Sequence, residues 1–277
     1  MEQMNSIKTI DTFSFNGEPI VKLRLEYLYQ FVDKFVIVEA MYTHSGQRKG
    51  KLYKEMYLEW FLPYNEKIHW VIIDEFPEIT EYWLEKYKIH NWMGTNHVHW
   101  FRETYQRDTS KQYIMDSYKD QKYIVCVGDV DEIPDVNVLE LLKSNETYES
   151  IKEPVYLEMH FFYYTFEWKK QYMWYRSFVI RGDKLNDESF THWRIHYSPK
   201  LVCRNAGWHC SYFMTPVDLK RKIESFAHRE CDIDEYKDAL KIQTCIEQGK
   251  DIFMRGEDED LIRCEISLPT QFYHFNQ

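Results

Sequence analysis

The sequence predicts an α/β fold with a mostly parallel central sheet flanked by helices. Apolar, β-branched runs at 35–38, 68–73 and 123–128 have the composition of strands buried on both faces. Segments of helical periodicity separate these runs, and such alternation is typical of parallel strands joined by crossover helices. An acidic residue follows each run: Glu39, Asp74 and Asp129.

The first helix should begin near Asn16 or Gly17, with Pro19 in its first turn. Its apolar residues recur at intervals of four, three and four positions, which is the period of one helix face: Val21, Leu25, Leu28 and Val32. We expect the helix to end at 33–34, directly before the strand 35–38.

Further helices are expected at 53–62 and over most of 80–120, with Gly94 as the break between two of them. In the later of these two helices one side carries a group of polar residues: His99, Glu103, Gln106 and Arg107. Another helix is expected through 136–142, after the third strand.

The second half of the chain differs in its residue composition and in the strands it predicts. Segments rich in aromatic rings predict longer, more antiparallel strands at 155–164 and 172–180. A helix should follow Thr215, an N-cap residue with Asp218 three positions later, and a further helix should end at Gly249. Because there is no linker or repeat, we expect one domain over 1–277 with halves of about 1–135 and 136–277.

The composition limits the classes of partner. The net charge of −10 argues against nucleic acid or an anionic membrane surface, since both reward clustered Lys and Arg. No signal peptide and no membrane span are expected, and the six cysteines form no C-x-x-C pair, so we expect a cytoplasmic protein. Aromatic residues make up 17% of the chain, which fits a tyrosine-rich core first and sugar stacking second.

The stretch 123–134 carries the strongest chemical signal. Its apolar strand breaks at Gly128 and delivers three acids: Asp129, Asp131 and Glu132. Ligands of open α/β sheets bind outside the carboxyl ends of the strands. Asp129 and Asp131 share one side of an extended segment, and paired carboxylates suit Mg²⁺ or Mn²⁺ held together with substrate phosphates. The alternative is an exposed acidic turn.

His209 lies in a loop of small residues, and taken alone it fits a structural histidine better than a ligand. The same holds for His97 and His99, whose spacing is no zinc signature. The sequence also lacks H-E-x-x-H, G-x-S-x-G, a Walker loop and G-x-G-x-x-G, which removes the common zinc-protease, hydrolase, P-loop and dinucleotide-binding interpretations.

Five ordered motifs nevertheless resemble those of one family. They are Phe15-Asn-Gly-Glu18; Val32-Asp-Lys-Phe-Val-Ile-Val-Glu-Ala40 with Thr43-His-Ser-Gly46; Gln106-Arg107; Gly128-Asp-Val-Asp-Glu-Ile-Pro134; and Gly207-Trp-His-Cys-Ser211. Over roughly 13–255 the chain is similar to glycosyltransferase family 17, the family of the bisecting N-acetylglucosaminyltransferase. This resemblance implies a GT-A-like, Rossmann-type nucleotide-sugar fold, an inverting reaction and a divalent metal, Mn²⁺ or Mg²⁺. The earlier half would then bind the nucleotide sugar and the later half the acceptor.

The resemblance also implies roles for individual residues. Asp129 and Asp131 would hold the metal and the diphosphate, with Glu132 continuing this motif at the reaction centre. The other residues would contact the donor, which we expect to be UDP-linked: Glu39 near the base or ribose, Arg102 and Arg107 at the nucleotide, and Trp208 folded over it. His209, from the same motif as Trp208, would fold over the donor as well and is expected to be catalytic together with Glu132.

Some questions stay open at this point. Glu132 is the first choice as general base, with Glu158 and Glu224 in reserve. The animal members carry a membrane anchor and stem that we do not find here, so neither N-acetylglucosamine as donor sugar nor the animal acceptor follows. The alternatives are a metal-dependent nucleotidyltransferase and a glycan-binding protein without catalysis.

Overall fold

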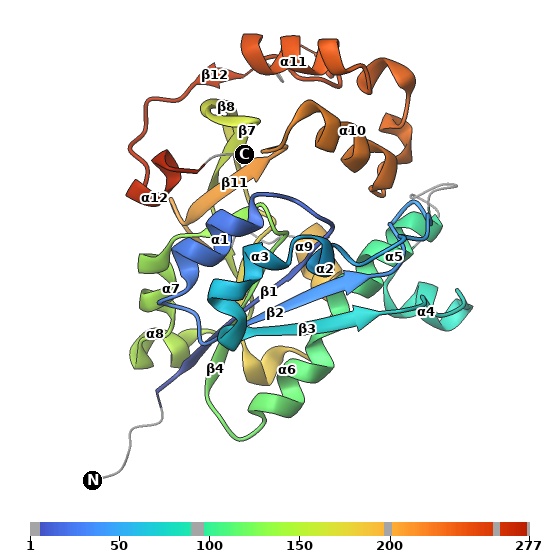
Figure 1. The fold of residues 1–277 in the computed structure, drawn as a ribbon. Coiled ribbons are helices and arrows are strands. Elements are labelled where there is room, and N and C mark those ends of the chain that lie inside the picture. Colours follow the sequence, from blue (N-terminus) through green and yellow to red (C-terminus); the bar gives the residue numbers. More distant parts are fainter. Residues whose placement is uncertain (1–5, 90–96, 197–200, 257–260, 276–277) are drawn as a thin grey trace.

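A computed structural model describes residues 6–89, 97–196, 201–256 and 261–275 (Figure 1). Its larger sheet has seven strands in the order β10-β6-β9-β4-β1-β2-β3. The strands are β1 (Lys8–Ser14), β2 (Lys34–Ala40), β3 (Ile68–Ile73), β4 (Tyr123–Val127), β6 (Val155–Leu157), β9 (Phe178–Arg181) and β10 (Val202–Cys203). All neighbours are parallel except β9, which is antiparallel to β4 and β6. The predicted α/β class with a mostly parallel sheet is confirmed.

A smaller sheet of five strands follows the order β12-β8-β7-β11-β5. It consists of β5 (Glu132–Pro134), β7 (Met159–Tyr163), β8 (Thr165–Trp174), β11 (Gly207–Ser211) and β12 (Ile262–Arg263). The short β5 pairs antiparallel with β11, so the acidic loop after β4 runs directly into this second sheet. Gly207 permits the pairing, because a Cβ there would lie 2.3 Å from the carbonyl oxygen of Ile133.

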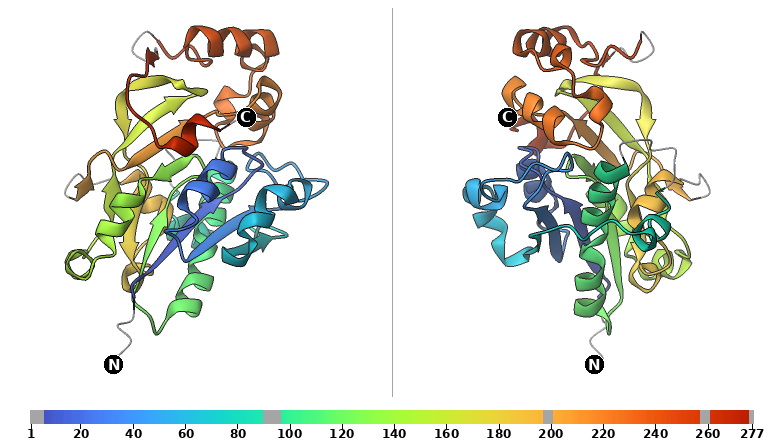
Figure 2. Two further views of the ribbon diagram at one scale, coloured as in Figure 1. Left: turned by 60° about the vertical axis from the view of Figure 1, so that its left-hand side comes forward. Right: turned by 90° about the vertical axis from the view of Figure 1, so that its right-hand side faces the viewer.

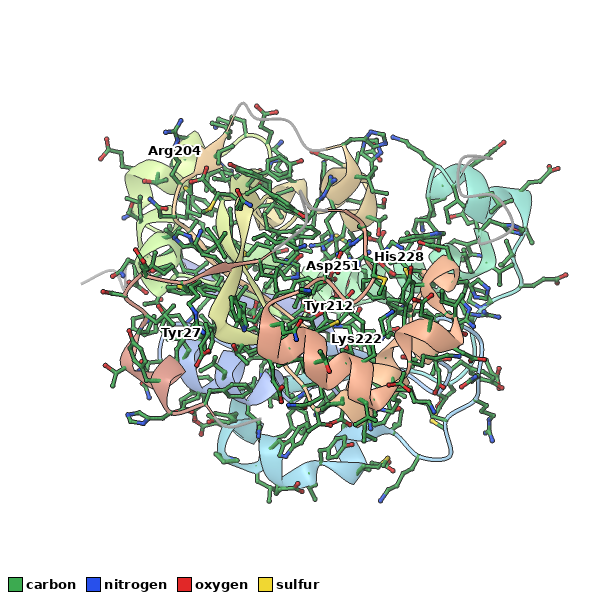
Figure 3. All side chains as sticks on the ribbon, turned by 90° about the horizontal axis from the view of Figure 1, so that it is seen from above. Tyr27, Arg204, Tyr212, Lys222, His228 and Asp251 are labelled. Atoms are coloured by element: carbon green, nitrogen blue, oxygen red, sulfur yellow. The ribbon has the colours of Figure 1, made fainter. Side chains whose placement is uncertain are left out.

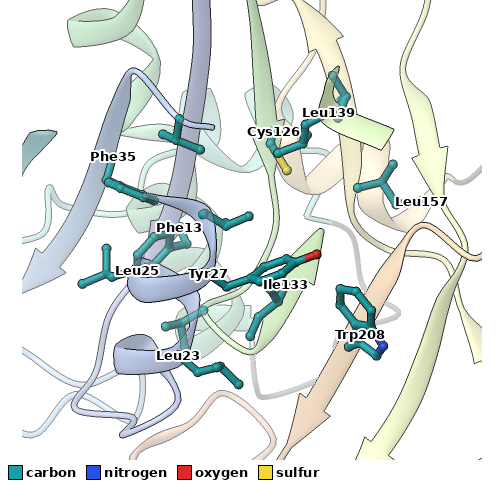
Figure 4. Close-up of a cluster of buried hydrophobic side chains, with 14 of the residues drawn as sticks. Phe13, Leu23, Leu25, Tyr27, Phe35, Cys126, Ile133, Leu139, Leu157 and Trp208 are labelled. Atoms are coloured by element: carbon teal, nitrogen blue, oxygen red, sulfur yellow. The ribbon is translucent and has the colours of Figure 1, made fainter. Parts of the chain in front are cut away.

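Successive side chains of a strand point to opposite faces of the sheet, and the central strands carry apolar side chains on both. Helices therefore cover both faces of the larger sheet. On one face Phe13, Phe35 and Cys126 pack against α1 (Val21–Leu28), α3 (Leu58–Phe61), α7 (Val136–Leu142) and α8 (Asn145–Ser150) (Figure 4). On the other face Ile10 and Val125 pack against α6 (Ser110–Tyr118) and α9 (Phe190–Ile195).

The remaining elements complete the layers around the sheets. The other α-helices are α2 (Tyr53–Met56), α4 (Glu81–Lys86), α5 (His97–Asp108), α10 (Pro216–Ser225), α11 (Ala239–Gln248) and α12 (Thr270–Tyr273). Short 3-10 helices are η1 (Leu62–Lys67), η3 (Gly182–Lys184), η4 (Arg229–Cys231) and η5 (Asp234–Tyr236). Both views in Figure 2 show α10 and α11, in orange and red, above one end of the larger sheet. In the described part of the chain no helix combines the length and apolar character needed to cross a membrane.

Most predicted elements are present, with several differences. The helix α1 ends at Leu28 rather than at 33–34, the predicted helix 53–62 divides at Tyr57, and the strand predicted at 172–180 is interrupted between β8 and β9. The strand β1 was not predicted, because its buried Thr9 and Asp11 break the apolar pattern. Gly94 lies outside the described residues. The halves 1–135 and 136–277 share both sheets.

Candidate active site

A cavity of about 220 Å³ lies at the carboxyl ends of β1 and β4. The chain runs from β1 to β2 and β3 on one side and then returns to β4 on the other, so this is the point where the strand order reverses. Its walls come from the turn after β1, the loop after β2, helix α5, the acidic loop, and the ends of β8 and β11. The last part of the wall belongs to the C-terminal layer, by which we mean residues 212–256 with α10 and α11. Figure 3 looks down on that layer and shows Tyr212, Lys222 and His228 in one region of it.

A buried arginine fixes the backbone of the acidic loop. Arg24 on α1 is fully buried, and its guanidinium donates to both carboxylate oxygens of Asp11 at 2.8 and 2.7 Å. Its Nη1 also donates to the carbonyl oxygens of Asp129 at 2.8 Å and Glu132 at 2.7 Å. A planar fork of donors can satisfy several acceptors at once, so Arg24 sets the conformation of the loop between β4 and β5.

Asp129 is held by two arginines from different helices. One of its oxygens accepts from Arg107 Nη2 at 3.0 Å and the other from Arg194 Nη2 at 2.6 Å. Burial alone would raise the pKa of the Asp129 carboxyl, but the charges of Arg194 and Arg107 hold it well below its usual range. This carboxylate is therefore ionised and orients both guanidinium groups.

Glu132 lies behind the cavity wall and is fully buried. Its carboxylate accepts from Arg194 at 2.7 and 2.9 Å, from Trp174 Nε1 at 2.6 Å, from the Asp129 amide at 2.8 Å and from the Ser177 hydroxyl. Burial would raise the pKa of Glu132, yet the Arg194 charge lowers it. An acceptor surrounded by this many donors supports the site rather than presenting a basic oxygen to a ligand.

Asp131 faces the cavity beside His209 and Lys222. Its Oδ2 accepts from Lys222 Nζ at 3.2 Å, and its Oδ1 lies 3.7 Å from His209 Nε2. Burial lowers the pKa of His209, so its imidazole is neutral near pH 7. The ring is clamped between Phe161 and Trp174, each with its centroid 4.4 Å from that of the imidazole.

Comparison with known proteins decides the family. The sequence model of glycosyltransferase family 17 matches residues 2–259. The chain belongs to glycosyltransferase family 17. Three similar curated proteins, from Rattus norvegicus, Mus musculus and Homo sapiens, are each named β-1,4-mannosyl-glycoprotein 4-β-N-acetylglucosaminyltransferase and are 22% identical over 274 residues. The matches cover 87% of this chain and 48% of each relative, so the chain spans about half the length of these relatives.

The site of this family 17 glycosyltransferase contains four of the residues predicted for it. Arg107, Asp129, Asp131 and His209 all line the cavity. Trp208, by contrast, points from β11 into the core, where its ring packs against Tyr27 and Phe272 at 5.6 and 4.8 Å (Figure 4). The alternation of a strand separates it from the neighbouring His209.

Two further predicted contacts lie outside the cavity wall. Glu39 is fully buried and accepts from Lys49 Nζ at 3.3 Å and from the amides of Tyr53 and Lys54 at 2.6 and 3.0 Å. Arg102 donates to the His44 carbonyl at 3.1 Å. The contacts of Glu39 and Arg102 with the nucleotide remain predictions.

The reserve bases also lie away from the cavity. Glu158 accepts from the Tyr175 hydroxyl at 2.8 Å, and neither Glu158 nor Glu224 is part of the wall.

Several wall residues of this family 17 protein had no predicted role: Glu18, His44, Glu103 and Lys222. A signal was available for some of them. Glu18 and His44 stand within the family motifs, and Lys222 lies on the apolar stripe of α10 with Leu219 and Ile223. Arg194, which reaches Asp129 from α9, belongs to no motif.

The wall fits a divalent cation that is shared with substrate phosphates. Four carboxylates but only two Lys or Arg side chains line the cavity, so a diphosphate would need additional positive charge. Within the described residues no three Asp, Glu, His or Cys side chains gather as a metal site. Asp131 Oδ1 and Nε2 of the neutral His209 nevertheless lie 3.7 Å apart, and both atoms can act as metal ligands. Mg²⁺ commonly takes one or two protein ligands together with substrate phosphates. Asp129 does not fit this role, because each of its oxygens accepts from an arginine.

Proposed function

We propose that this family 17 glycosyltransferase has a GT-A-like fold and transfers N-acetylglucosamine from a UDP-linked donor to a glycan hydroxyl with inversion. The observation that carries the proposal is a cavity at the reversal of strand order that brings Asp131, His209 and Lys222 together. The names of the three mammalian relatives support the choice of sugar and of acceptor class.

Asp131 and His209 would hold Mn²⁺ or Mg²⁺ together with the diphosphate of the donor. When bound, the cation would stabilise the departing UDP as a Lewis acid. Lys222 and Arg107 would contact the phosphates as fixed cations. Asp129 and Glu132 would keep Arg107 and Arg194 in place, which gives the acidic motif a positioning role beside its ligand role.

Glu18 is our proposed general base. The other carboxylates of the wall, Glu103, Asp129 and Asp131, are each already occupied by a hydrogen bond from Arg or Lys. Among the described residues, Glu18 accepts only from the Asn16 amide, at 2.8 Å. It also lines the same cavity wall as Asp131 and Lys222.

The reaction would be one displacement at the anomeric carbon. The bond from that carbon to the diphosphate oxygen breaks as the acceptor oxygen forms its own bond from the opposite face. Glu18 takes the proton of the acceptor hydroxyl, and the electron pair of the broken bond leaves with UDP.

The proposal is tested by incubating the protein with UDP-N-acetylglucosamine, Mn²⁺ and glycan acceptors while measuring released UDP and pyrophosphate. We expect acceptor-dependent release of UDP that a chelator abolishes. Release of pyrophosphate would indicate a nucleotidyltransferase instead. Glycan binding that needs neither nucleotide nor cation would indicate a binding protein without catalysis.

The ligand role of Asp131 has its own variant. Asp131→Asn should lower kcat/KM by about a hundredfold or more, because a Lewis acid contributes several kcal/mol to such a reaction. Asp116→Asn on α6 serves as the matched control, because in the described part of the chain this carboxylate accepts from Gln112 alone. Wild-type kcat/KM in Asp131→Asn would refute the assignment.

A further inference from the structure

The hydrogen bonds of Gln106 determine the tautomer of His44 in the cavity wall. Gln106 Nε2 donates to the Val38 carbonyl at 3.0 Å, so its Oε1 is the atom that faces His44 Nε2 at 2.9 Å. The reverse orientation of the amide would place two buried oxygens against each other. Because Gln106 Oε1 can only accept, His44 Nε2 carries the proton and donates.

The other ring nitrogen of His44 therefore presents a lone pair. Burial lowers the pKa of His44, which keeps the ring neutral, so Nδ1 bears no proton. This nitrogen lies 3.7 Å from Glu103 Oε2. The second oxygen of Glu103 accepts from Arg107 Nη2 at 2.8 Å, which fixes the orientation of the carboxylate. The wall thus holds two acceptors side by side, His44 Nδ1 and Glu103 Oε2, with no hydrogen between them.

The His44 and Glu103 side chains are 17% and 21% exposed, so a ligand in the cavity can reach them. Two acceptors this close are stabilised by a ligand that brings a hydrogen-bond donor to them. A phosphate cannot do so, because it has only acceptor oxygens and would meet the negative charge of Glu103. Lys222 offers the phosphates a better partner elsewhere in the wall. Phe226 and His228 add ring surface to the same cavity, which suits a flat, partly apolar group.

We infer that His44 and Glu103 select the nucleoside of the sugar donor by accepting one of its hydrogens. The hydrogen is the imide N–H of uracil or a hydroxyl of ribose. This inference rests on the proposed function, since it assigns one part of the UDP-linked donor to one part of the wall. It makes Glu103 and His44 specificity-determining residues, at a position separate from the reacting carbon.

Four ligands test the inference on the whole protein with Mn²⁺, by calorimetry: UDP, N3-methyl-UDP, 2′-deoxy-UDP and 3′-deoxy-UDP. We expect the analogue that lacks the recognised hydrogen to bind about tenfold to a hundredfold more weakly than UDP, which is the loss for a hydrogen bond to a charged group. A loss with N3-methyl-UDP identifies the base, and a loss with a deoxy analogue identifies the ribose.

Variants connect the loss to these two side chains. Glu103→Gln and His44→Phe should weaken UDP and leave that analogue nearly unchanged, so the preference for UDP disappears. Glu85→Gln, an exposed glutamate on α4, is the control and should keep the preference. Equal affinity for all four ligands, or a preference that survives in both variants, would overturn this inference alone. A protein that does not bind UDP would overturn the proposed function together with it.

Discussion

Glu18 shows how the partners of a carboxylate decide its chemical role. It enters the cavity wall from the turn after β1, and none of the Lys or Arg hydrogen bonds that occupy Glu103, Asp129 and Asp131 reaches it. The same residue type thus serves two purposes within one cavity. The carboxylates that accept from Arg or Lys hold those cations in position, whereas Glu18 accepts from a backbone amide and is not held by such a hydrogen bond.

Glu18→Gln should therefore lower kcat by about a hundredfold to ten-thousandfold, the usual contribution of general base catalysis. The affinity for UDP with Mn²⁺ should change little, because Gln keeps the size and the acceptor oxygen. Steady-state kinetics and calorimetry measure the two quantities separately. Glu26→Gln, exposed on α1, is the control. An unchanged kcat in Glu18→Gln would assign the base to another residue.

For single residues, a sequence pattern predicts only those site residues that local spacing places together. Asp129 and Asp131 were predictable because a buried strand precedes them and their side chains alternate. Arg194 and Lys222 were not predictable, because they meet these acids from 65 and 91 residues away. Only folding brings such partners together, and no local period records it.

The pairing of β5 with β11 connects the acidic loop to His209 at the scale of elements. The amide of Cys210 donates to the Asp131 carbonyl at 2.7 Å, and Gly207 leaves room for the carbonyl of Ile133. One short strand pair thus fixes the distance between the carboxylate and the imidazole that we propose to bind the cation.

Gly207→Ala should separate these two strands, because the new methyl group would lie 2.3 Å from a backbone oxygen. We expect the free energy of unfolding to fall by about 1–3 kcal/mol, as for an overpacked core. The affinity for Mn²⁺ in the presence of UDP should fall as well. Gly50→Ala is the matched control, because no atom lies within 4 Å of its added Cβ. Equal free energies of unfolding of the two variants would show that β5 and β11 can accommodate the methyl group, which would contradict this prediction.

Arg24 links α1 to the acidic loop, and its removal would leave Asp11 charged and buried. Arg24→Met should lower the free energy of unfolding by about 3–5 kcal/mol. Asp11→Leu should be costly for the same reason, and the double variant should cost less than the sum of the two. Urea unfolding of the four proteins measures this coupling. Strict additivity would contradict the paired role. Lys220→Met, at an exposed position of α10, is the control for the loss of a positive charge at the surface.

Arg24 and β1 also show which elements a sequence reveals. β4 is apolar throughout and β2 is apolar from Phe35 to Val38, so both were predicted from composition. β1 escaped prediction because Asp11 interrupts it, and the burial of Asp11 becomes favourable only when Arg24 reaches it from α1. An arginine within the apolar stripe of a helix was the available sign of such a partner.

At the scale of the whole molecule, the free energy of unfolding should depend on pH through Asp251, which binds two residues at the C-terminal layer. Its carboxylate accepts from Arg255 Nε at 2.6 Å and lies 3.3 Å from the Tyr163 hydroxyl. Burial would raise the pKa of Asp251, but Arg255 lowers it below the ordinary value of 3.8. A carboxyl with a depressed folded-state pKa stabilises the fold above its unfolded value. That stability is lost as the pH falls through the folded value.

The free energy of unfolding should therefore fall as the pH drops below 3.8, and this fall should be shallower in Asp251→Asn. At pH 7 the same variant should be less stable by about 1–3 kcal/mol, since a buried acceptor loses charge. Denaturant titrations from pH 2 to pH 7 measure both effects. Parallel pH profiles of the two proteins would remove Asp251 from this role.

The pairing of β5 with β11 also sets the order in which the protein can mature on the ribosome. The strands β1 to β4 are complete once residue 127 has been made, so they can associate early. The acidic loop then waits until β11 and α10 have emerged, because His209 and Lys222 are its later partners. Nascent chains that stop before residue 207 should therefore contain the paired strands β1 to β4 but should not bind the nucleotide sugar. The ability to bind the nucleotide sugar should arise in a late folding step that depends on long-range contacts.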